Sequence, residues 1–301
     1  MVASKKSIGL HFDLDGKISL ITGAGRGIGR TVALNLARAG SDIALVARSQ
    51  AELDSVVQEI QDLGRRAAAF PADLTQIRQL ESLTAKISRT MGGIDVLVNN
   101  AGYGLLGPVE ATDPGEYRPL FEVNFFGAAE VIRALLPYMR QRRSGYIINT
   151  TSIGGFAASP GFGFYAASKF AMEGLSEAVA LDTAVFGIKV TILEPGSTRT
   201  DFAGGSMTRT ARVIEEYQQS AVQSTLDRMN ARHGAQPGDP HRLAKILLKF
   251  SRMEEPPLRF TTGEDGLSRM RNKLQATTAE TEKFARLSLA VEFGSDVDLD
   301  Q

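Results

Sequence analysis

Short apolar runs alternate with helix-period segments over residues 17–194, and this alternation constrains the fold more than any other feature. The predicted strands are Ile18–Ile21, Asp42–Val46, Arg66–Phe70, Val96–Asn99, Gly145–Thr150 and Lys189–Leu193. The predicted helices between them are Thr31–Ala39, Ala51–Leu63, Ile77–Thr90, Pro119–Gln141 and Ala166–Ala184. Strands that are apolar throughout are typical of a parallel sheet covered on both faces. The pattern therefore predicts an α/β fold, a Rossmann-type doubly wound parallel sheet in one domain.

The pattern changes after Gly196. Apolar residues recur at helical spacing over 213–229, which indicates a helix that either packs on the core or forms part of a substrate lid over about 200–236. A short helix at His241–Ser251 and a last strand at Leu258–Thr261 are predicted next. We therefore divide the chain into an N-terminal extension (1–14), a Rossmann domain with a C-terminal helical substrate-binding extension (15–270), and a C-terminal helix and tail (271–301). The stretch from Thr277 onward ends acidic and is predicted to be partly disordered.

Composition excludes several classes of function. Lysine plus arginine and aspartate plus glutamate number 34 each, so no net field attracts nucleic acid or an anionic membrane. The absence of cysteine excludes disulfides and a thiolate nucleophile, and the three histidines lack ligand spacing, so no metal site is predicted. No apolar stretch approaches the ~20 residues of a membrane span, and no signal peptide is recognisable. We expect a cytoplasmic protein whose partner is a small molecule.

A glycine-rich segment, Thr22–Gly29, follows the first predicted strand and precedes the first predicted helix. Its glycines are Gly23, Gly27 and Gly29, and Ile28 stands where a G-x-G-x-x-G pattern would place its last glycine. Glycines let the backbone approach a pyrophosphate, and the helix that follows directs its amides and positive dipole end toward the phosphates. In this context the segment predicts a dinucleotide site.

The end of the second predicted strand indicates which dinucleotide is bound. Enzymes that use NAD place an acidic residue there, which accepts the ribose 2′-hydroxyl. This strand ends instead in Ala47-Arg48-Ser49. Arg48, together with Arg26 in the glycine loop, is suited to bracket a 2′-phosphate by charge-assisted hydrogen bonds. NADP(H) is therefore the predicted cofactor, and NAD is the alternative.

Tyr165 and Lys169 are four residues apart and share one face of a predicted helix. A tyrosine ordinarily titrates near ~10, and a neighbouring ammonium lowers that value toward the working range. Ser152 ends the preceding strand, where its hydroxyl can polarise a substrate oxygen. With a nicotinamide supplying hydride, these groups predict an oxidoreductase that acts on a carbonyl or an alcohol.

These motifs together resemble the short-chain dehydrogenase/reductase family, from about Asp15 to Arg199. The features that carry the resemblance are Thr22–Gly29, Asp73-Leu74, Asn99–Gly102, Asn124, Ser152, Tyr165–Lys169, Pro195-Gly196, Thr198 and Thr200. Within the family, three segments resemble the 17β-hydroxysteroid-dehydrogenase-like branch: Asn99–Gly104, Glu194–Gly196 and Pro257–Phe260.

The resemblance implies four catalytic residues. Tyr165 is expected as general acid/base and Ser152 as the group that orients the carbonyl. Lys169 is expected to hold the nicotinamide ribose and lower the tyrosine pKa, and Asn124 to anchor a water of the proton relay. The cofactor residues expected from the motifs and the resemblance together are Gly23, Arg26, Gly27, Ile28, Gly29, Arg48, Ser49, Asp73, Leu74, Asn100, Ala101, Gly102, Tyr165, Lys169, Pro195, Gly196, Thr198 and Thr200.

A hydrophobic ketone or secondary alcohol is the expected substrate, because the residues predicted to face the nicotinamide are apolar and include no arginine or lysine to hold an acid. The predicted substrate residues are Tyr103, Leu105, Ile153, Phe156 and Phe162. Two other classes stay open. One is a non-catalytic NADP(H)-binding regulatory protein. The other is a sugar-nucleotide epimerase or dehydratase, for which the segment after Gly196 is short. The family also implies a homodimer or homotetramer that pairs Pro119–Gln141 and Ala166–Ala184.

Overall fold

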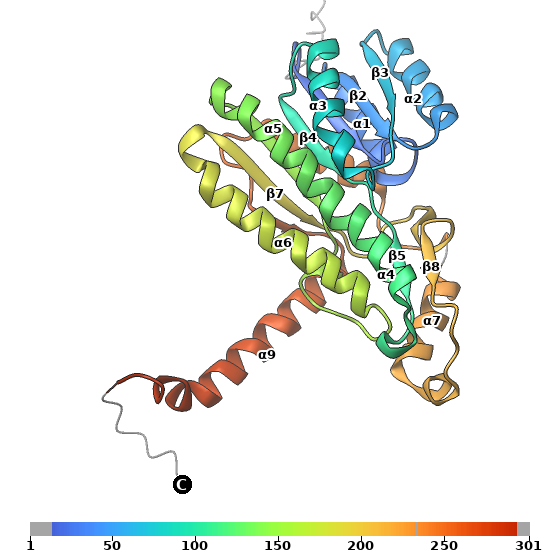
Figure 1. The fold of residues 1–301 in the computed structure, drawn as a ribbon, viewed down its shortest axis with the longest axis vertical. Helices are drawn as coiled ribbons and strands as arrows, with labels where there is room; N and C mark the ends of the chain where they lie inside the picture. The colour runs from blue at the N-terminus through green and yellow to red at the C-terminus, as the bar shows by residue number, and fades with distance from the viewer. Residues whose placement is uncertain (1–13, 233, 294–301) are drawn as a thin grey trace, which may run out of the picture.

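A seven-stranded, all-parallel sheet forms the centre of the computed structural model, which describes residues 14–232 and 234–293 (Figure 1). The strands follow the order β3-β2-β1-β4-β6-β7-β9. Their bounds are β1 (Ile18–Thr22), β2 (Asp42–Ala47), β3 (Ala67–Pro71), β4 (Val96–Asn99), β6 (Gly145–Thr150), β7 (Ile188–Glu194) and β9 (Arg259–Thr261). The chain order reverses between β1 and β4, as in a doubly wound sheet. The predicted Rossmann-type fold is confirmed.

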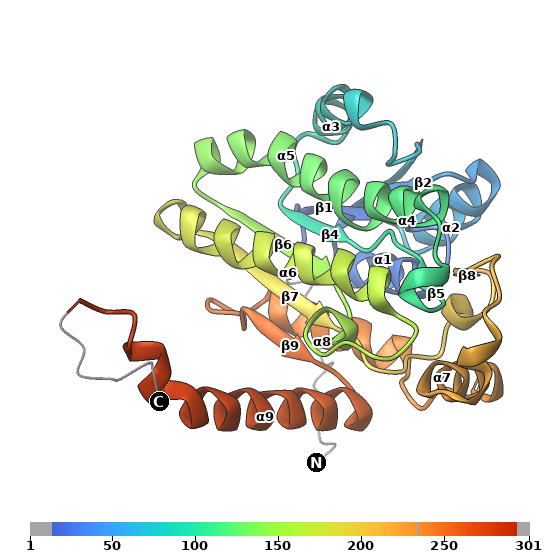
Figure 2. The ribbon, with the colours of Figure 1, turned by 60° about the horizontal axis from the view of Figure 1, so that its bottom comes forward.

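Helices cover both faces of the sheet (Figures 1 and 2). One face packs against α1 (Gly27–Arg38), α2 (Gln50–Asp62) and α8 (Pro240–Ser251), and the other against α3 (Ile77–Met91), α5 (Ala128–Arg142) and α6 (Gly163–Thr183). Leu45 of β2 and Leu97 of β4 are fully buried between these layers. Among the described helices none is long and apolar enough to span a bilayer.

The helix predicted at Pro119–Gln141 starts earlier and changes pitch. It begins as α4 (Pro114–Phe121), passes through a π-helical turn, η2 (Glu122–Gly127), and continues as α5. The start predicted at Pro119 is wrong, because Asp113 and Glu116 form a reciprocal capping box one turn upstream. Asn124 lies in this π-helical turn and is buried, with only 2% of its surface exposed.

The segment predicted as a lid folds over the carboxyl ends of the strands. It contains η5 (Asp201–Ala203), β8 (Met207–Arg209), η6 (Glu215–Gln219) and α7 (Ala221–Ala231). β8 pairs in parallel with β5 (Gly104–Leu106) to form a second small sheet, and neither strand was predicted. Three further single turns are η1 (Val109–Ala111), η3 (Ile153–Gly155) and η4 (Ala184–Phe186).

The chain ends in a long helix, α9 (Glu264–Leu289), which leaves the body next to β9 and extends away from it (Figure 2). Of the stretch from Thr277 onward that is predicted to be partly disordered, the residues up to Leu289 continue the helix. The domain boundary predicted at residue 270 falls inside α9. The acidic end beyond 293 and the extension before Leu14 lie outside the described residues.

Candidate active site

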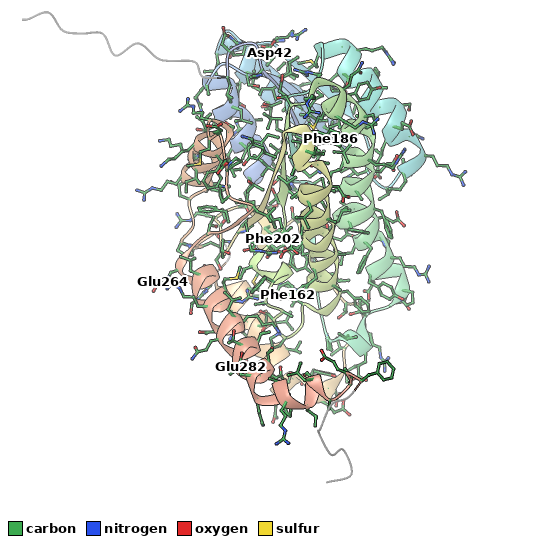
Figure 3. All side chains as sticks on the ribbon, turned by 90° about the vertical axis from the view of Figure 1, so that its left-hand side faces the viewer. Asp42, Phe162, Phe186, Phe202, Glu264 and Glu282 are labelled. Carbon is green, nitrogen blue, oxygen red and sulfur yellow. The ribbon has the colours of Figure 1, made fainter. Side chains whose placement is uncertain are left out.

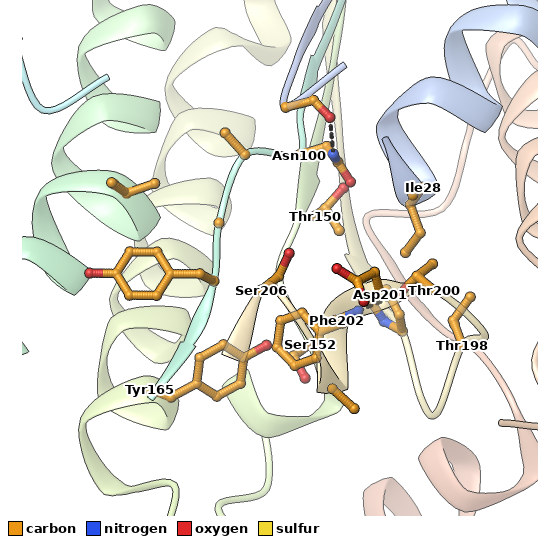
Figure 4. A pocket seen from close by; sticks show the side chains of 18 of the residues that line it. Ile28, Asn100, Thr150, Ser152, Tyr165, Thr198, Thr200, Asp201, Phe202 and Ser206 are labelled. Carbon is orange, nitrogen blue, oxygen red and sulfur yellow. Dashed lines mark hydrogen bonds between the residues drawn. The ribbon is translucent and has the colours of Figure 1, made fainter. Parts of the chain in front are cut away.

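A cavity of about 1190 Å³ opens at the carboxyl ends of the sheet, where the strand order reverses between β1 and β4. Ligands of open α/β sheets bind at this place because the loops after neighbouring strands diverge there. The glycine loop lines one part of the cavity, and Ser152, Tyr165 and Lys169 line another (Figure 4). The cavity is therefore large enough to hold a dinucleotide and a second molecule together.

The glycine loop has the shape that a pyrophosphate requires. Gly23 and Gly27 adopt positive φ angles of 63° and 56°, and a Cβ at Gly29 would lie 2.3 Å from the carbonyl oxygen of Gly23. Helix α1 begins at Gly27, and no side chain caps its first amides. The amides and the close backbone path therefore fit a nicotinamide dinucleotide.

A tight connection joins this loop to the segment after β4. The Thr22 hydroxyl accepts hydrogen bonds from the amides of Asn100 and Ala101 at 3.0 and 3.1 Å. The Asn100 side-chain amide donates to the carbonyls of Thr22 and Gly23, at 3.3 Å each. Asn100 therefore braces the turn on which the pyrophosphate would lie.

The structure brings the predicted cofactor residues together, with one exception. Gly29 lies behind the loop, where it permits the close helix–strand contact. The others all line the cavity: Gly23, Arg26, Gly27, Ile28, Arg48, Ser49, Asp73, Leu74, Asn100, Ala101, Gly102, Tyr165, Lys169, Pro195, Gly196, Thr198 and Thr200.

The two arginines expected at the 2′-position have different surroundings. Arg26 extends toward the lid segment, where it donates to the Ser206 hydroxyl at 2.9 Å and meets the Asp201 carboxylate at 3.5 Å. Arg48 is exposed and has no hydrogen-bond or ion-pair partner among the described residues. Glu52 also lines the cavity, and a Cβ on Gly25 would lie 2.5 Å from its carboxylate oxygen. Sequence reasoning missed Glu52 because it follows the strand end by a turn of helix.

Ser152 and Tyr165 reach the cavity from different elements. Ser152 follows β6 and caps η3, where its hydroxyl accepts from the Gly154 amide at 3.0 Å. Tyr165 lies in the first turn of α6, with its ring 5.6 Å from the ring of Phe162 and 5.8 Å from that of Phe202. Figure 4 shows the Tyr165 hydroxyl directed toward the space beside Ser152 and Phe202. Two hydroxyls thus share an apolar wall of the cavity.

Burial controls the charge state of the two titratable groups on α6. It raises the pKa of Tyr165 to about 12, against smaller lowering effects of a Ser152 hydrogen bond and the Arg269 charge. The lowered tyrosine pKa expected from Lys169 is therefore wrong for this structure, because desolvation of the phenol dominates. Burial also lowers the pKa of Lys169 to about 8. The Lys169 ammonium lies 6.0 Å from the Tyr165 ring centre and donates to the Thr150 carbonyl at 3.0 Å.

Asn124 does not line the cavity, but its side chain hydrogen-bonds to two elements that do. Its side-chain oxygen accepts from the Tyr103 amide, and its nitrogen donates to the Tyr103 carbonyl, both at 3.0 Å. The same nitrogen donates to the Ser168 hydroxyl on α6 at 3.1 Å. In this structure the side chain joins the loop after β4 to the helix that carries Tyr165 and Lys169.

The predicted substrate residues divide into two groups. Tyr103, Ile153 and Phe162 line the cavity. The other two do not: Leu105 is 3% exposed and packs with Leu120, and the ring of Phe156 lies 5.2 Å from the Arg259 guanidinium. An apolar residue near a site is not distinguished by sequence from one that fills the core behind it. The structure adds Phe202 and Met229 to the cavity wall.

The cavity also contains arginines, which corrects the expectation that no cation is placed to hold an acid. Arg228 of α7, Arg232 directly after α7 and Arg269 of α9 all line it. None of the three has a carboxylate within ion-pair distance among the described residues. The Arg269 guanidinium donates to the Ala157 carbonyl, and burial lowers its pKa. The sequence analysis did not predict these three arginines, because each lies more than 60 residues after Tyr165 in the chain.

Behind the site, a buried ion cluster joins α6 to the last two strands. Arg259 donates to Glu173 of α6 and to Glu194 at the end of β7, and it also pairs with Glu177. Burial raises the pKa of Glu173 to about 7, and its carboxylate accepts from the Thr151 hydroxyl at 3.0 Å. The cluster therefore fixes the residue before Ser152 and the helix that carries Lys169.

The comparisons with known proteins agree with this arrangement. A family model described as short chain dehydrogenase matches residues 17–210. Oxidoreductase BOA17 of Botryotinia fuckeliana is 35% identical over 91% of this chain and 98% of its own. A solved short-chain dehydrogenase from Streptomyces avermitilis is 36% identical, with a TM-score of 0.85 over 92% of this chain and 98% of that one.

Estradiol 17-beta-dehydrogenase 1 of Rattus norvegicus is 31% identical over 91% of this chain and 82% of its own, which gives weak support to the 17β-hydroxysteroid-dehydrogenase-like branch. A metagenomic short-chain oxidoreductase solved in complex with NADP is 25% identical, with a TM-score of 0.66 over 83% of this chain and 96% of that one. The family model covers most of the Rossmann domain, and Oxidoreductase BOA17 and the Streptomyces avermitilis structure are each covered over 98% of their own length. The chain therefore belongs to the short-chain dehydrogenase/reductase family of nicotinamide-dependent oxidoreductases.

Proposed function

We propose that the protein is an NADP(H)-dependent reductase of hydrophobic ketones, with Tyr165 as the general acid, and that it oxidises the corresponding secondary alcohols in the reverse direction. The observation that carries this proposal is the joint placement of Ser152, Tyr165 and Lys169 on the wall of the cavity that the glycine loop also lines. A module that only binds a dinucleotide has no need of two hydroxyls and an ammonium at the far end of its site.

The protonation states suit the reductive direction. A bound nicotinamide cofactor would supply the hydride. Because burial raises the pKa of Tyr165 to about 12, the phenol carries its proton at neutral pH and can donate it to a carbonyl oxygen. Ser152 provides a second hydroxyl that can donate a hydrogen bond to the same oxygen. Lys169 donates one hydrogen bond to the Thr150 carbonyl, and an ammonium has two further N–H groups that can donate to a ribose hydroxyl.

The cavity wall narrows the substrate class. Phe162, Phe202 and Met229 offer an apolar surface, and Arg269 adds a guanidinium that donates to the Ala157 carbonyl and has no carboxylate within ion-pair distance among the described residues. Gln236 lines the same cavity, and its buried side-chain oxygen accepts no hydrogen bond from the described residues. That oxygen is satisfied by a donor on the ligand, whereas a half-buried cation without a counter-ion favours a negatively charged group. We therefore propose a ketone with an apolar body and an acidic group.

Replacing the tyrosine tests the reaction. Tyr165→Phe should lower turnover of NADPH with a panel of aryl and alkyl ketones by at least ~100-fold, the usual scale of general acid catalysis. The variant should keep its affinity for NADPH. Tyr146→Phe is the matched control, because that phenol is equally buried, also has a pKa raised to about 12, and lies outside the cavity lining. Equal turnover by wild type and Tyr165→Phe would refute the assignment and favour the non-catalytic regulatory alternative.

NAD(H) remains a second candidate for the cofactor, and Glu52 is the observation that favours it. Its carboxylate lies over the glycine loop, where it can accept a ribose hydroxyl and would repel a 2′-phosphate. Calorimetric titration of both cofactors decides between the two. If NADPH is the cofactor, Arg48→Ala should weaken NADPH binding by about tenfold or more and leave NADH unchanged. If Glu52→Gln selectively weakens NADH binding, NAD is the cofactor.

A cytoplasmic homodimer or homotetramer is part of the same proposal. Its support is the exposure of large apolar side chains on the helices expected to pair, namely Phe126 on η2, Tyr138 on α5, and Phe170 and Leu181 on α6.

A further inference from the structure

Helix α9 packs against almost nothing in the part of the chain that the structure describes. Of its 26 residues only Gly266 is buried, and every residue from Arg271 to Phe284 is exposed. The body holds only the first turns, where Asp265 accepts from the Ser197 amide at 2.9 Å and Arg269 donates to Ala157. Figures 2 and 3 show the rest of the helix, which Glu264 and Glu282 mark, on the outside of the molecule.

A helix in water gains most of its stability from packing an apolar face, and α9 has such a face without a cover. Side chains at heptad spacing form a single stripe along it. The members of this stripe are Leu267, Met270, Leu274, Thr277, Thr281 and Phe284. Three of its large apolar side chains are exposed to solvent: Leu267 by 42%, Leu274 by 51% and Phe284 by 45%. A seven-residue repeat of this kind is the pattern of a helix that packs along a second helix.

We propose that this stripe pairs antiparallel with the same stripe of a second copy of the chain. In that register the two stripes meet layer by layer, and each large side chain is covered. The layers join Leu267 to the partner's Phe284, Met270 to the partner's Thr281, and Leu274 to the partner's Thr277. The threonines at the centre are small, so the two helices can approach closely there.

Charge favours the antiparallel direction. Lys273 and Glu280 flank the stripe on the same side, one heptad apart. Antiparallel pairing brings Lys273 next to the partner's Glu280, twice in each pair because of the two-fold symmetry. Parallel pairing would instead place Lys273 beside the partner's Thr278, without an opposite charge.

The position of the body favours the same direction. The body is attached to α9 at its first turn (Figure 2). In a parallel pair two bodies would compete for space at one end of the helices. In an antiparallel pair they lie at opposite ends, separated by about 1.5 Å for each residue of overlap.

The native chain has no cysteine, so engineered disulfides report the register without interference. Leu274→Cys and Thr277→Cys are purified separately in the full chain, mixed under reducing conditions and then oxidised. The proposal expects a disulfide-linked dimer that contains one chain of each variant, identified by mass spectrometry of the linked peptides. Leu274→Cys oxidised alone should stay largely unlinked. A disulfide-linked dimer of Leu274→Cys alone would indicate parallel pairing. No disulfide in any sample would indicate that α9 does not pair with a second copy. Either result overturns the proposal.

A charge swap tests the same register by an independent route. Lys273→Glu should raise the dissociation constant of the α9-dependent assembly at least several-fold in analytical ultracentrifugation, and Lys273→Glu combined with Glu280→Lys should restore it. An assembly mass that is identical in wild type, Lys273→Glu and Leu274→Glu would overturn the proposal. Binding of the wild-type monomer to lipid vesicles, with loss of that binding in Leu274→Glu, would assign the stripe to a membrane surface instead. None of these measurements depends on turnover.

Discussion

Replacing Arg259 by methionine should reveal how strongly the buried ion cluster holds α6, the helix that carries Tyr165 and Lys169. Arg259 donates to Glu173 and Glu194, which are 5% and 0% exposed. Without the arginine, these carboxylates are buried and uncompensated, and breaking such a pair costs about 3–5 kcal/mol. The side chain of Glu177 is half exposed and adds little.

Protonation sets an upper limit on that cost and makes it depend on pH. A carboxyl group with an ordinary pKa of 4.5 can always be neutralised, at about 1.4 kcal/mol for each pH unit above that value. For a carboxyl that is fully charged in the wild type, the limit is therefore about 5 kcal/mol at pH 8 and about 2 kcal/mol at pH 6. For Glu173, whose pKa is already about 7 in the wild type, the limit is about 1.4 kcal/mol at pH 8 and close to zero at pH 6. Because a raised pKa in the folded state means stability lost as pH rises, the difference between wild type and Arg259→Met should grow from pH 6 to pH 8.

Guanidinium chloride denaturation followed by circular dichroism at both pH values measures the effect. Arg133→Met is the matched control: Arg133 also contacts two carboxylates, on Glu81 and Glu130, but its side chain is 61% exposed. Its loss should cost at most about 1 kcal/mol at either pH. If Arg259→Met costs as little as Arg133→Met at pH 8, the reasoning from burial is refuted.

Three further outcomes follow from the geometry of the site. Lys169→Met should abolish turnover, yet in the same denaturation assay it should stabilise the cofactor-free protein by about 1–3 kcal/mol at pH 7, because burial lowers the pKa of Lys169 to about 8. This gain in stability should disappear as pH rises from 8 toward 10. Gly29→Ala should remove NADPH binding in calorimetry, because its Cβ would lie 2.3 Å from the Gly23 carbonyl oxygen, whereas Gly174→Ala, with open space around it, should bind normally. Arg269→Met should raise KM for aryl ketones that carry a carboxylate by about tenfold or more and leave KM for their methyl esters unchanged; an equal effect on both would show that Arg269 only holds the fold.

Much of the cofactor site was predictable because its signals are local. The turn at Gly23 and Gly27 needs backbone angles that favour glycine, and a helix must start directly after it. The spacing of Tyr165 and Lys169 places both on one side of α6 whatever surrounds the helix. The parallel direction of the strands also follows from the alternation of strand and helix, since a helix between two strands returns the chain to the same end of the sheet.

Other features arise from contacts between distant segments, and no local pattern contains them. Leu105 and Phe156 are apolar like Ile153, yet only Ile153 lines the cavity, because the packing of β5 and the position of Arg259 decide which side chain turns inward. The start of the helix predicted at Pro119 was wrong for a different reason. Its signal, the capping box at Asp113, was present in the sequence and overlooked.

By itself, then, the sequence determined the sheet, the dinucleotide loop and the identity of the hydroxyls and the ammonium that meet there, because backbone geometry and helical spacing act over a few residues. Only the tertiary structure decided how those groups are charged and what else faces them. Burial, which depends on the whole fold, raises the pKa of Tyr165 against the effect expected from its neighbour. The position of α7 over the carboxyl ends of the sheet and of the first turns of α9 beside β9 brings Arg228 and Arg269 into the cavity, and neither segment's own sequence indicates this.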